Sequence, residues 1–265
     1  IYPHLDIIDA HFNVVRDGVQ HCVHASAELG MERMAMAAGP ISVEIIKALN
    51  ILRIRLEPFE GMAADITFTG RAFPIEEPRF THRIGPRAFM DYTRLTQNGG
   101  YAGWIEVDGD KQDLAAGTTG TRDRSWGVRL FFHVNNDAQG NAWNTRAAWA
   151  GEGASPDQIT EGHGSMRTRL EQGTRWPSGG TLSLALRGAP EQVTFEPLGR
   201  FQMRGLGYTD PNWGHGLHHG PLEVVREDIE LDDIDPLAPE NLHVQVPVRV
   251  SGNDGSEGIG VFEQL

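Results

Sequence analysis

Apolar and polar side chains alternate along most of this chain, the pattern of strands that bury one face. Between residues 52 and 56, apolar side chains alternate with Arg53 and Arg55. Residues 181–187 alternate in the same way, and residues 242–250 place one Leu and four Val on one face. We therefore expect strands at these three places.

Two Asp-Gly pairs predict hairpins. Residues 5–29 alternate on both sides of Asp17-Gly18, and residues 101–115 do so around Asp108-Gly109. An Asp-Gly pair between alternating segments is typical of a two-residue turn, because both turn positions need φ > 0. The pattern predicts further strands at 128–134, 142–150, 166–172, 192–195 and 200–206.

Single glycines and prolines separate these runs, which favours an all-β protein, a barrel or sandwich in two halves with at most short helices. Residues 31–50 are ambiguous: 31–38 and 43–49 could form short helical turns. The charged run 79–86, flanked by prolines, predicts a boundary between an N-terminal half, 1–88, and a C-terminal half, 89–265. Because the chain starts without Met and enters patterned sequence at once, we expect a trimmed N-terminus, which would leave the first half incomplete.

The formal net charge of −13 excludes some partners. An acidic surface repels nucleic-acid phosphates and anionic membranes, and no basic stripe offsets it. No apolar run reaches the roughly 18 residues that span a bilayer, and no signal peptide is visible, so we expect no membrane span and a cytoplasmic protein. The single cysteine, Cys22, excludes an internal disulfide and is expected to be a small buried side chain rather than a nucleophile.

The densest group of chemically useful residues is the stretch 120–129, Gly-Thr-Arg-Asp-Arg-Ser-Trp-Gly-Val-Arg. Its two glycines predict a tight loop that a ligand or another strand can approach closely. Asp123 is the only acid among the arginines, and Trp126 offers a large apolar wall. The same residues also suit a structural role, in which Arg–Asp pairs attach one loop to a barrel rim.

The second group is the glycine-rich stretch 207–220, which holds Trp213 and three histidines. His215, His218 and His219 have a spacing that could ligate a metal, but no paired Cys or HExxH helix accompanies them. We therefore expect no metal, and imidazoles that line a cleft. The acidic run 223–235 is expected to be a solvated strand and turn.

Both stretches combine glycines, an acid and a tryptophan, so a shared cavity would be lined by aromatic side chains. An acid against such walls has its pKa raised by desolvation and can donate a proton. Aromatic faces would stabilise a developing carbocation. This combination suits protonation of an alkene. The expected ligand-binding side chains are Trp126, Trp213, Arg122, Arg124, Arg129, Trp104 and Tyr92.

Residues 121–129 and the hairpin segment 103–109 resemble the AttH/carotenoid 1,2-hydratase (hydroxyneurosporene synthase) superfamily. Residues 212–216 and 260–264 are similar to its bacterial branches. The resemblance extends from about residue 92 to the end. It implies tandem lipocalin-like β-barrels and relatives that hydrate, isomerise or cyclise terpenoids and polyketides. Asp123 matches the acid of the hydratases, and Arg124 stands where they have a His.

The leading hypothesis is an enzyme without cofactors that carries out acid-assisted hydration, isomerisation or cyclisation of a neutral terpenoid-, steroid- or polyketide-like molecule. Asp123 would donate the proton, and His215 or Tyr208 would position water or a hydroxyl. The alternative is a lipocalin-like carrier or sensor of a hydrophobic small molecule, with Asp123 paired to arginines. A homodimer is left open.

Overall fold

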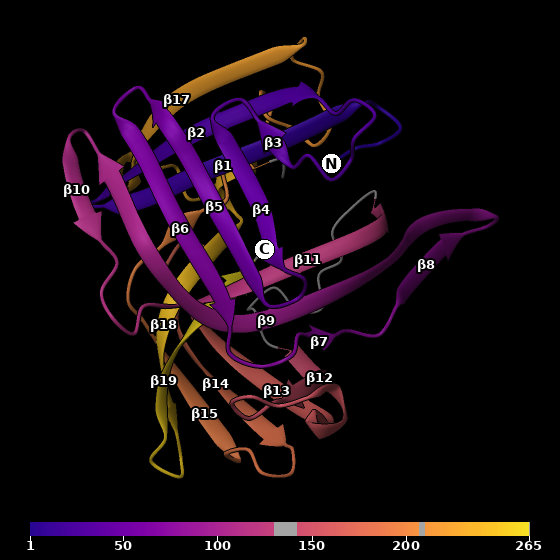
Figure 1. Cartoon of the computed structure of the whole chain (residues 1–265). Helices are drawn as coiled ribbons and strands as arrows, with labels where there is room; N and C mark the ends of the chain where they lie inside the picture. The colour runs from indigo at the N-terminus through magenta and orange to yellow at the C-terminus, as the bar shows by residue number, and fades with distance from the viewer. Residues whose placement is uncertain (130–141, 207–209, 265) are drawn as a thin grey trace. The chain divides into compact units, whose positions relative to one another are not determined.

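The computed structural model describes residues 1–129, 142–206 and 210–264. Strands dominate these residues and form curled sheets (Figure 1), so the all-β prediction is confirmed. The helical elements of the described chain are three single 3₁₀ turns, η1 (Pro156–Gln158), η2 (Leu231–Asp233) and η3 (Pro239–Asn241).

The strands belong to three sheets. The first has the order β1-β2-β17 and consists of β1 (Ile7–Arg16), β2 (Val19–Glu28) and β17 (Leu222–Glu230). The second is built on a long strand and consists of β3 (Ala37–Ala38), β4 (Ile41–Lys47), β5 (Ile51–Phe59), β6 (Met62–Gly70), β7 (Ile75–Glu76), β8 (Phe80–Ile84), β9 (Arg87–Val107), β10 (Asp110–Asp113) and β11 (Thr119–Arg129). The third consists of β12 (Ala142–Trp149), β13 (Thr160–Leu170), β14 (Pro177–Ala185), β15 (Gln192–Pro197), β16 (Phe201–Gln202), β18 (Val244–Gly252) and β19 (Glu257–Gln264).

Both predicted Asp-Gly hairpins form. Asp17 and Gly18 have φ values of 50° and 85°, and Asp108 and Gly109 have values of 51° and 82°. Two consecutive positive φ angles are the geometry of the turn that matches the twist of the flanking strands. These turns fix the pairing of β1 with β2 and of β9 with β10.

The structure differs from three local possibilities. Residues 31–38 and 43–49 are not helical. β3 and β4 occupy part of them, because β4 is rich in β-branched residues and pairs along its length with β5. The run 79–86, expected to mark a boundary, contains strand β8, which pairs with β9. The stretch 120–129 is not a loop but most of strand β11, which pairs with β9 from Thr119 to Arg129.

The chain divides into two compact units that are discontinuous in sequence. Unit 1 comprises residues 1–69, 101–118 and 200–245, and unit 2 comprises residues 70–100, 119–199 and 246–265. The boundary expected at residue 88 lies inside β9, which contributes to both units.

In unit 1, β1, β2 and β17 run across β4, β5 and β6 (Figure 1). The space between these layers is filled by one apolar cluster. Val23 and Ala25 enter it from β2, and Leu56 and Met62 enter it from β5 and β6, each at most 2% exposed. Because side chains of a strand alternate between faces, the other face of β1 and β2 carries a different set of residues, which is polar.

Candidate functional site

The stretch expected to hold the catalytic acid forms a strand surface in unit 2. Asp123 lies opposite Thr96 in the β9–β11 ladder. Its carboxylate Oδ2 is 3.5 Å from Nη1 of Arg94, and its side chain is 47% exposed. The Arg94 guanidinium also donates a hydrogen bond of 2.9 Å to Glu77. This position resembles the structural alternative, an acid paired to an arginine, more than an acid in an aromatic pocket.

The arginine next to Asp123 in space is not one of those next to it in sequence. Arg122 and Arg124 point to the opposite face of β11 because neighbouring strand residues alternate. The Arg124 guanidinium lies 5.7 Å from the ring centroid of Trp126, and the Trp126 side chain is partly exposed.

We expect Asp123→Asn to change the unfolding free energy by less than about 1 kcal/mol, since a half-exposed ion pair is screened by water. Urea denaturation of the variant measures this change. A loss of several kcal/mol would contradict the surface position of the pair. Ligand binding and turnover assays of the same variant test the catalytic hypothesis, which requires loss of turnover with a preserved fold.

The other expected ligand-binding residues have their own contacts. Tyr92 on β9 packs against Phe80, with ring centroids 5.7 Å apart. Trp104 belongs to unit 1, where Nζ of Lys111 lies 3.5 Å from its ring centroid. Arg129 ends β11 opposite Met90, but its side chain, like the whole of Tyr208, lies outside the described residues.

Asp210 organises the second stretch, in unit 1. Its carboxylate accepts backbone N–H bonds from Gly205 (2.9 Å), Asn212 (2.8 Å) and Trp213 (2.8 Å). It is 9% exposed. Three donated hydrogen bonds to one carboxylate fix the backbone on both sides of it, so Asp210 is a structural residue of the stretch rather than a proton donor.

Trp213 rests on histidines from two different strands and from its own segment. Its ring stacks on His219, with centroids 4.4 Å apart, and on His24 of β2, at 5.2 Å. The Nδ1 atoms of His24 and His11 are 2.8 Å apart. His215, the other catalytic candidate, has Nδ1 2.5 Å from the hydroxyl of Tyr2.

The sequence analysis did not select His11, His24 or Tyr2. One signal was available. Strand alternation places His11 and His24 on the same face of the predicted hairpin, and most residues on that face are polar. Nothing in the spacing showed that Trp213, almost two hundred residues later, would cover them.

Burial sets the chemistry of this polar layer. Desolvation, followed by the neighbouring His24, lowers the pKa of His11 to about 3, so His11 is neutral at pH 7. Burial likewise raises the pKa of the Cys22 thiol to about 12. Cys22 is fully buried, so the expectation of a small buried side chain is confirmed.

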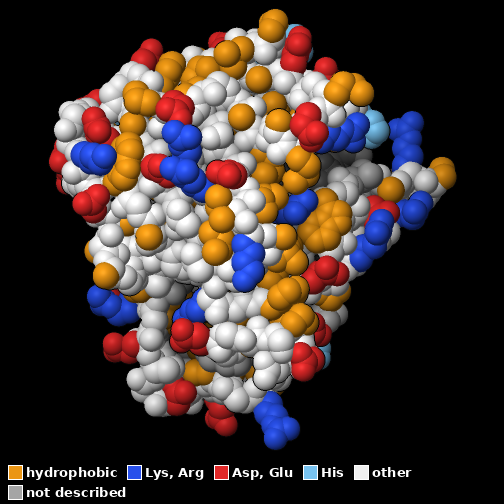
Figure 2. Space-filling model, in the orientation of Figure 1, with side chains coloured by type: hydrophobic (Ala, Val, Ile, Leu, Met, Phe, Trp, Pro, Cys, Tyr) orange, Lys and Arg blue, Asp and Glu red, His pale blue; other side chains and the backbone are white. Residues whose placement is uncertain are grey.

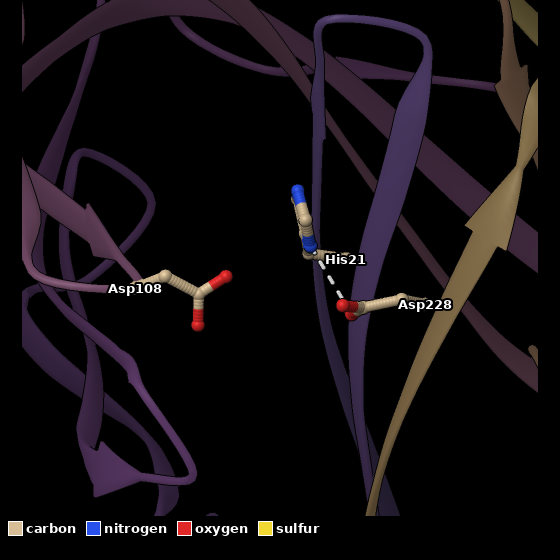
Figure 3. Close-up of side chains that lie close together, drawn as sticks. All are labelled: His21, Asp108 and Asp228. Atoms are coloured by element: carbon tan, nitrogen blue, oxygen red, sulfur yellow. Dashed lines mark ion pairs between the residues drawn. The ribbon is translucent and has the colours of Figure 1, made fainter.

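The histidines of the second stretch do not converge on one point. His219 Nδ1 lies 3.5 Å from Glu223, while His218 Nδ1 accepts an N–H bond from Gly220. Among the described residues, the one group with metal-ligand spacing is His21, Asp108 and Asp228 (Figure 3). His21 Nδ1 is 3.1 Å from Asp228.

Arg226 already supplies the positive charge of that group. Its guanidinium contacts Asp108 at 2.6 and 2.9 Å and Asp228 at 2.9 Å. These hydrogen bonds, the largest influence on that carboxyl, lower the pKa of Asp108. A cation would have to displace a bidentate arginine, so we interpret the group as an ion-pair network that attaches the β9–β10 turn to β17.

Unit 2 contains a cavity of about 510 Å³, within the usual range for small-molecule sites. One wall is formed by residues 71–75 and by residues 96–98 of β9, and another by β15, β18 and β19. The apolar lining includes Ala72, Phe73, Ile75, Ala148, Val193 and Val250. The polar lining consists of Arg71, Thr96, Gln97, Asn98, Ser256 and Glu257.

Two exposed glycines lie on the cavity wall and have open space beside them. A Cβ atom built on Gly151 or on Gly258 meets no heavy atom within 4 Å. Gln97, which is buried, holds part of this wall in place: its Nε2 donates a 2.7 Å hydrogen bond to the carbonyl of Ala72. Asp123 is not among the described side chains that line this cavity.

The two stretches that the sequence analysis combined belong to different units. Asp123, Trp126 and Tyr92 belong to unit 2, whereas Trp213 and His215 belong to unit 1. That they share one cavity stays a prediction. On the face shown in Figure 2, described basic side chains lie among acidic ones rather than in one block, as expected for an acidic chain. No helix among the described residues is long and apolar enough to cross a membrane.

One family model, described as "Family of unknown function (DUF8625)", matches residues 1–150 and residues 130–265, which together span the chain. No curated protein and no solved structure matches. The resemblance of residues 121–129 to the hydratase-like superfamily stays a prediction.

Proposed function

We propose that this chain, which belongs to the family of unknown function DUF8625, binds a small and mainly apolar molecule in the cavity of unit 2. The observation that carries the proposal is the 510 Å³ cavity itself, with apolar side chains on its walls and open space beside Gly151 and Gly258. Apolar walls with a few polar groups are the usual form of a small-molecule site.

The lining indicates how such a molecule would be held. Aliphatic side chains such as Val193 and Val250 would remove its apolar body from water, at about 25 cal/mol per Å² of buried apolar surface. Neutral hydrogen-bonding side chains, Thr96 and Asn98 among them, would orient its polar groups.

The geometry favours binding of a ligand without catalysis. A proton donor needs an environment that raises its pKa, such as an apolar wall. Asp123 instead lies beside the Arg94 guanidinium on a half-exposed strand surface. The carrier or sensor function is therefore better supported than acid-assisted catalysis.

The proposal is tested by filling the cavity. Gly258 lines the cavity, is not in the left-handed backbone region and has open space at its Cβ position, so Gly258→Trp places a large side chain at the cavity wall without backbone strain. With Nile red, a neutral apolar dye, we expect saturable fluorescence enhancement by the unmodified protein and at least tenfold weaker binding by the variant. Thermal melting should stay within a few degrees.

Gly199→Trp is the matched control, since Gly199 also has open space at its Cβ but does not line the cavity. It should bind the dye as the unmodified protein does. Equal affinity in all three proteins, or no saturable binding, would contradict the proposal. Native mass spectrometry of the purified protein would then identify any molecule retained.

A further inference from the structure

The polar face of β1 and β2 in unit 1 is buried although it lies away from the apolar core. Gln20, His24 and Ser26 of β2 are each at most 1% exposed. The register places His11 directly beside His24 and Asp9 beside Ser26. A layer of this polarity gains less from burial than apolar side chains would, because each polar group must lose its water.

A covering segment, residues 202–206 and 210–220, lies against this face, and its contacts need a particular shape. The Gln20 side chain exchanges two hydrogen bonds, of 2.9 and 2.8 Å, with the backbone of Gln202. Gly205 has φ +74°, and a Cβ there would lie 2.4 Å from the ring of His24. Trp213 then stacks on that same ring. Gly205 and Trp213 of the covering segment therefore both pack against the His24 ring.

The two imidazoles under the cover can hold at most one proton between their facing nitrogens. At 2.8 Å, one Nδ1 atom must donate and the other must accept. If both rings were protonated, both Nδ1 atoms would carry hydrogens that point at each other. Doubly protonated, the pair cannot keep this contact, and the rings must separate.

The charged groups around the pair influence how readily it takes up a proton. Glu227 of β17 lies 3.6 Å from His24 Nε2, beyond hydrogen-bond length but close enough to attract a cation. Arg204 lies 3.5 Å from the other oxygen of Glu227 and offsets that attraction. The groups that act on His11 from the neighbouring elements are His24, His215, His219 and Asp210.

We propose that this pair is an acid-sensitive latch: as the pH falls, a proton taken up by His11 charges the pair and releases residues 210–220 from the β1–β2 face. His24, His215 and His219 disfavour a positive charge on His11, and Asp210 favours one; burial adds to the unfavourable influences. Once the segment opens, water solvates both rings and the unfavourable influences disappear.

The direction and the size of the pH effect follow from linkage between proton binding and opening of the segment. In the closed form, the pKa of His11 is about 3. In the open form, where the ring is exposed to water, the pKa returns to its ordinary value of about 6.5. The open form therefore binds protons more readily, and the closed form is favoured fully above pH 6.5. Below that, each pH unit raises the opening equilibrium constant about tenfold until pH approaches 3, so pH 4.5 gives roughly a hundredfold increase.

Hydrogen–deuterium exchange of the intact chain tests the latch. The amides of Asn212 and Trp213, bonded to Asp210, report opening of the segment. After correction for intrinsic exchange rates, we expect their protection to fall about a hundredfold between pH 7.5 and pH 4.5. Amides of β4 and β5 in the same unit should change much less.

His11→Phe keeps an aromatic ring but cannot take up a proton, so its protection should be nearly independent of pH. His11→Gln serves as a second variant if the Phe ring does not fit. Exposed His4 provides the control, and His4→Phe should respond to pH as the unmodified protein does. Constant protection of Asn212 and Trp213 down to pH 4.5, or an unchanged response in both His11 variants, would overturn the proposal.

Discussion

Gly127→Ala is expected to destabilise unit 2 by about 3–5 kcal/mol, as the sum of a strained backbone and a steric clash. Gly127 has φ +133°, a conformation that residues with a Cβ rarely adopt. A Cβ built there would lie 2.2 Å from the carbonyl oxygen of Asp91 and 2.6 Å from Cα of Tyr92. These atoms are backbone of the paired strand β9, so they cannot rotate away.

Gly188→Ala, also in unit 2, is the matched control. Gly188 has a positive φ, +77°, but open space at its Cβ position. It should lose only about 1 kcal/mol, the backbone part alone. Urea denaturation of both variants measures the difference. Equal losses would mean that β11 does not pass β9 as closely as described. The glycine of the Ser125-Trp126-Gly127 motif is thus explained by strand packing, with no need of a ligand.

The second large effect is expected at Asp210→Ala, with a loss of about 2–4 kcal/mol. The substitution leaves three backbone N–H groups, those of Gly205, Asn212 and Trp213, without their acceptor. Asp210 is nearly buried, so water replaces the carboxylate only in part. Thermal denaturation gives the stability, and the emission that Trp213→Phe removes, with and without Asp210→Ala, shows whether the Trp213 ring leaves His24.

Two controls separate the causes. Asp210→Asn keeps one carbonyl acceptor and should retain most of the stability. Asp235→Ala removes an exposed carboxylate that accepts one N–H bond, from Leu237, and should cost less than about 1 kcal/mol. If Asp210→Ala costs no more than Asp235→Ala, Asp210 does not organise the segment, and its role as an acid would have to be considered again.

The local pattern was sufficient for the strands and the tight turns. Alternation and the two Asp-Gly pairs depend on residues next to one another, and these interactions persist whatever the rest of the chain does. The same reasoning left 43–49 ambiguous, where Leu and Lys suit a helix but pairing with β5 holds the strand. It failed for 120–129, because two glycines indicate a turn unless a neighbouring strand needs the space that they leave.

For the candidate site, the sequence selected residues that matter but assigned some of them wrong partners. Trp213 and His215 do lie in a cluster of aromatic and imidazole rings. Asp123 pairs with Arg94 of β9 rather than with the flanking Arg122 or Arg124. The physical reason is the strand itself, which turns adjacent side chains to opposite faces.

By itself, then, the sequence determined the all-β class, the hairpins, the acidic charge and the burial of Cys22, since each depends on composition or on neighbours a few residues apart. Only the tertiary structure decided the rest. The cavity of unit 2 arises where strands distant in sequence form its walls. The His11–His24 pair depends on β-sheet register, and its cover comes from Trp213, far along the chain. Contacts of this kind are set by the packing of whole sheets, and no local pattern encodes them.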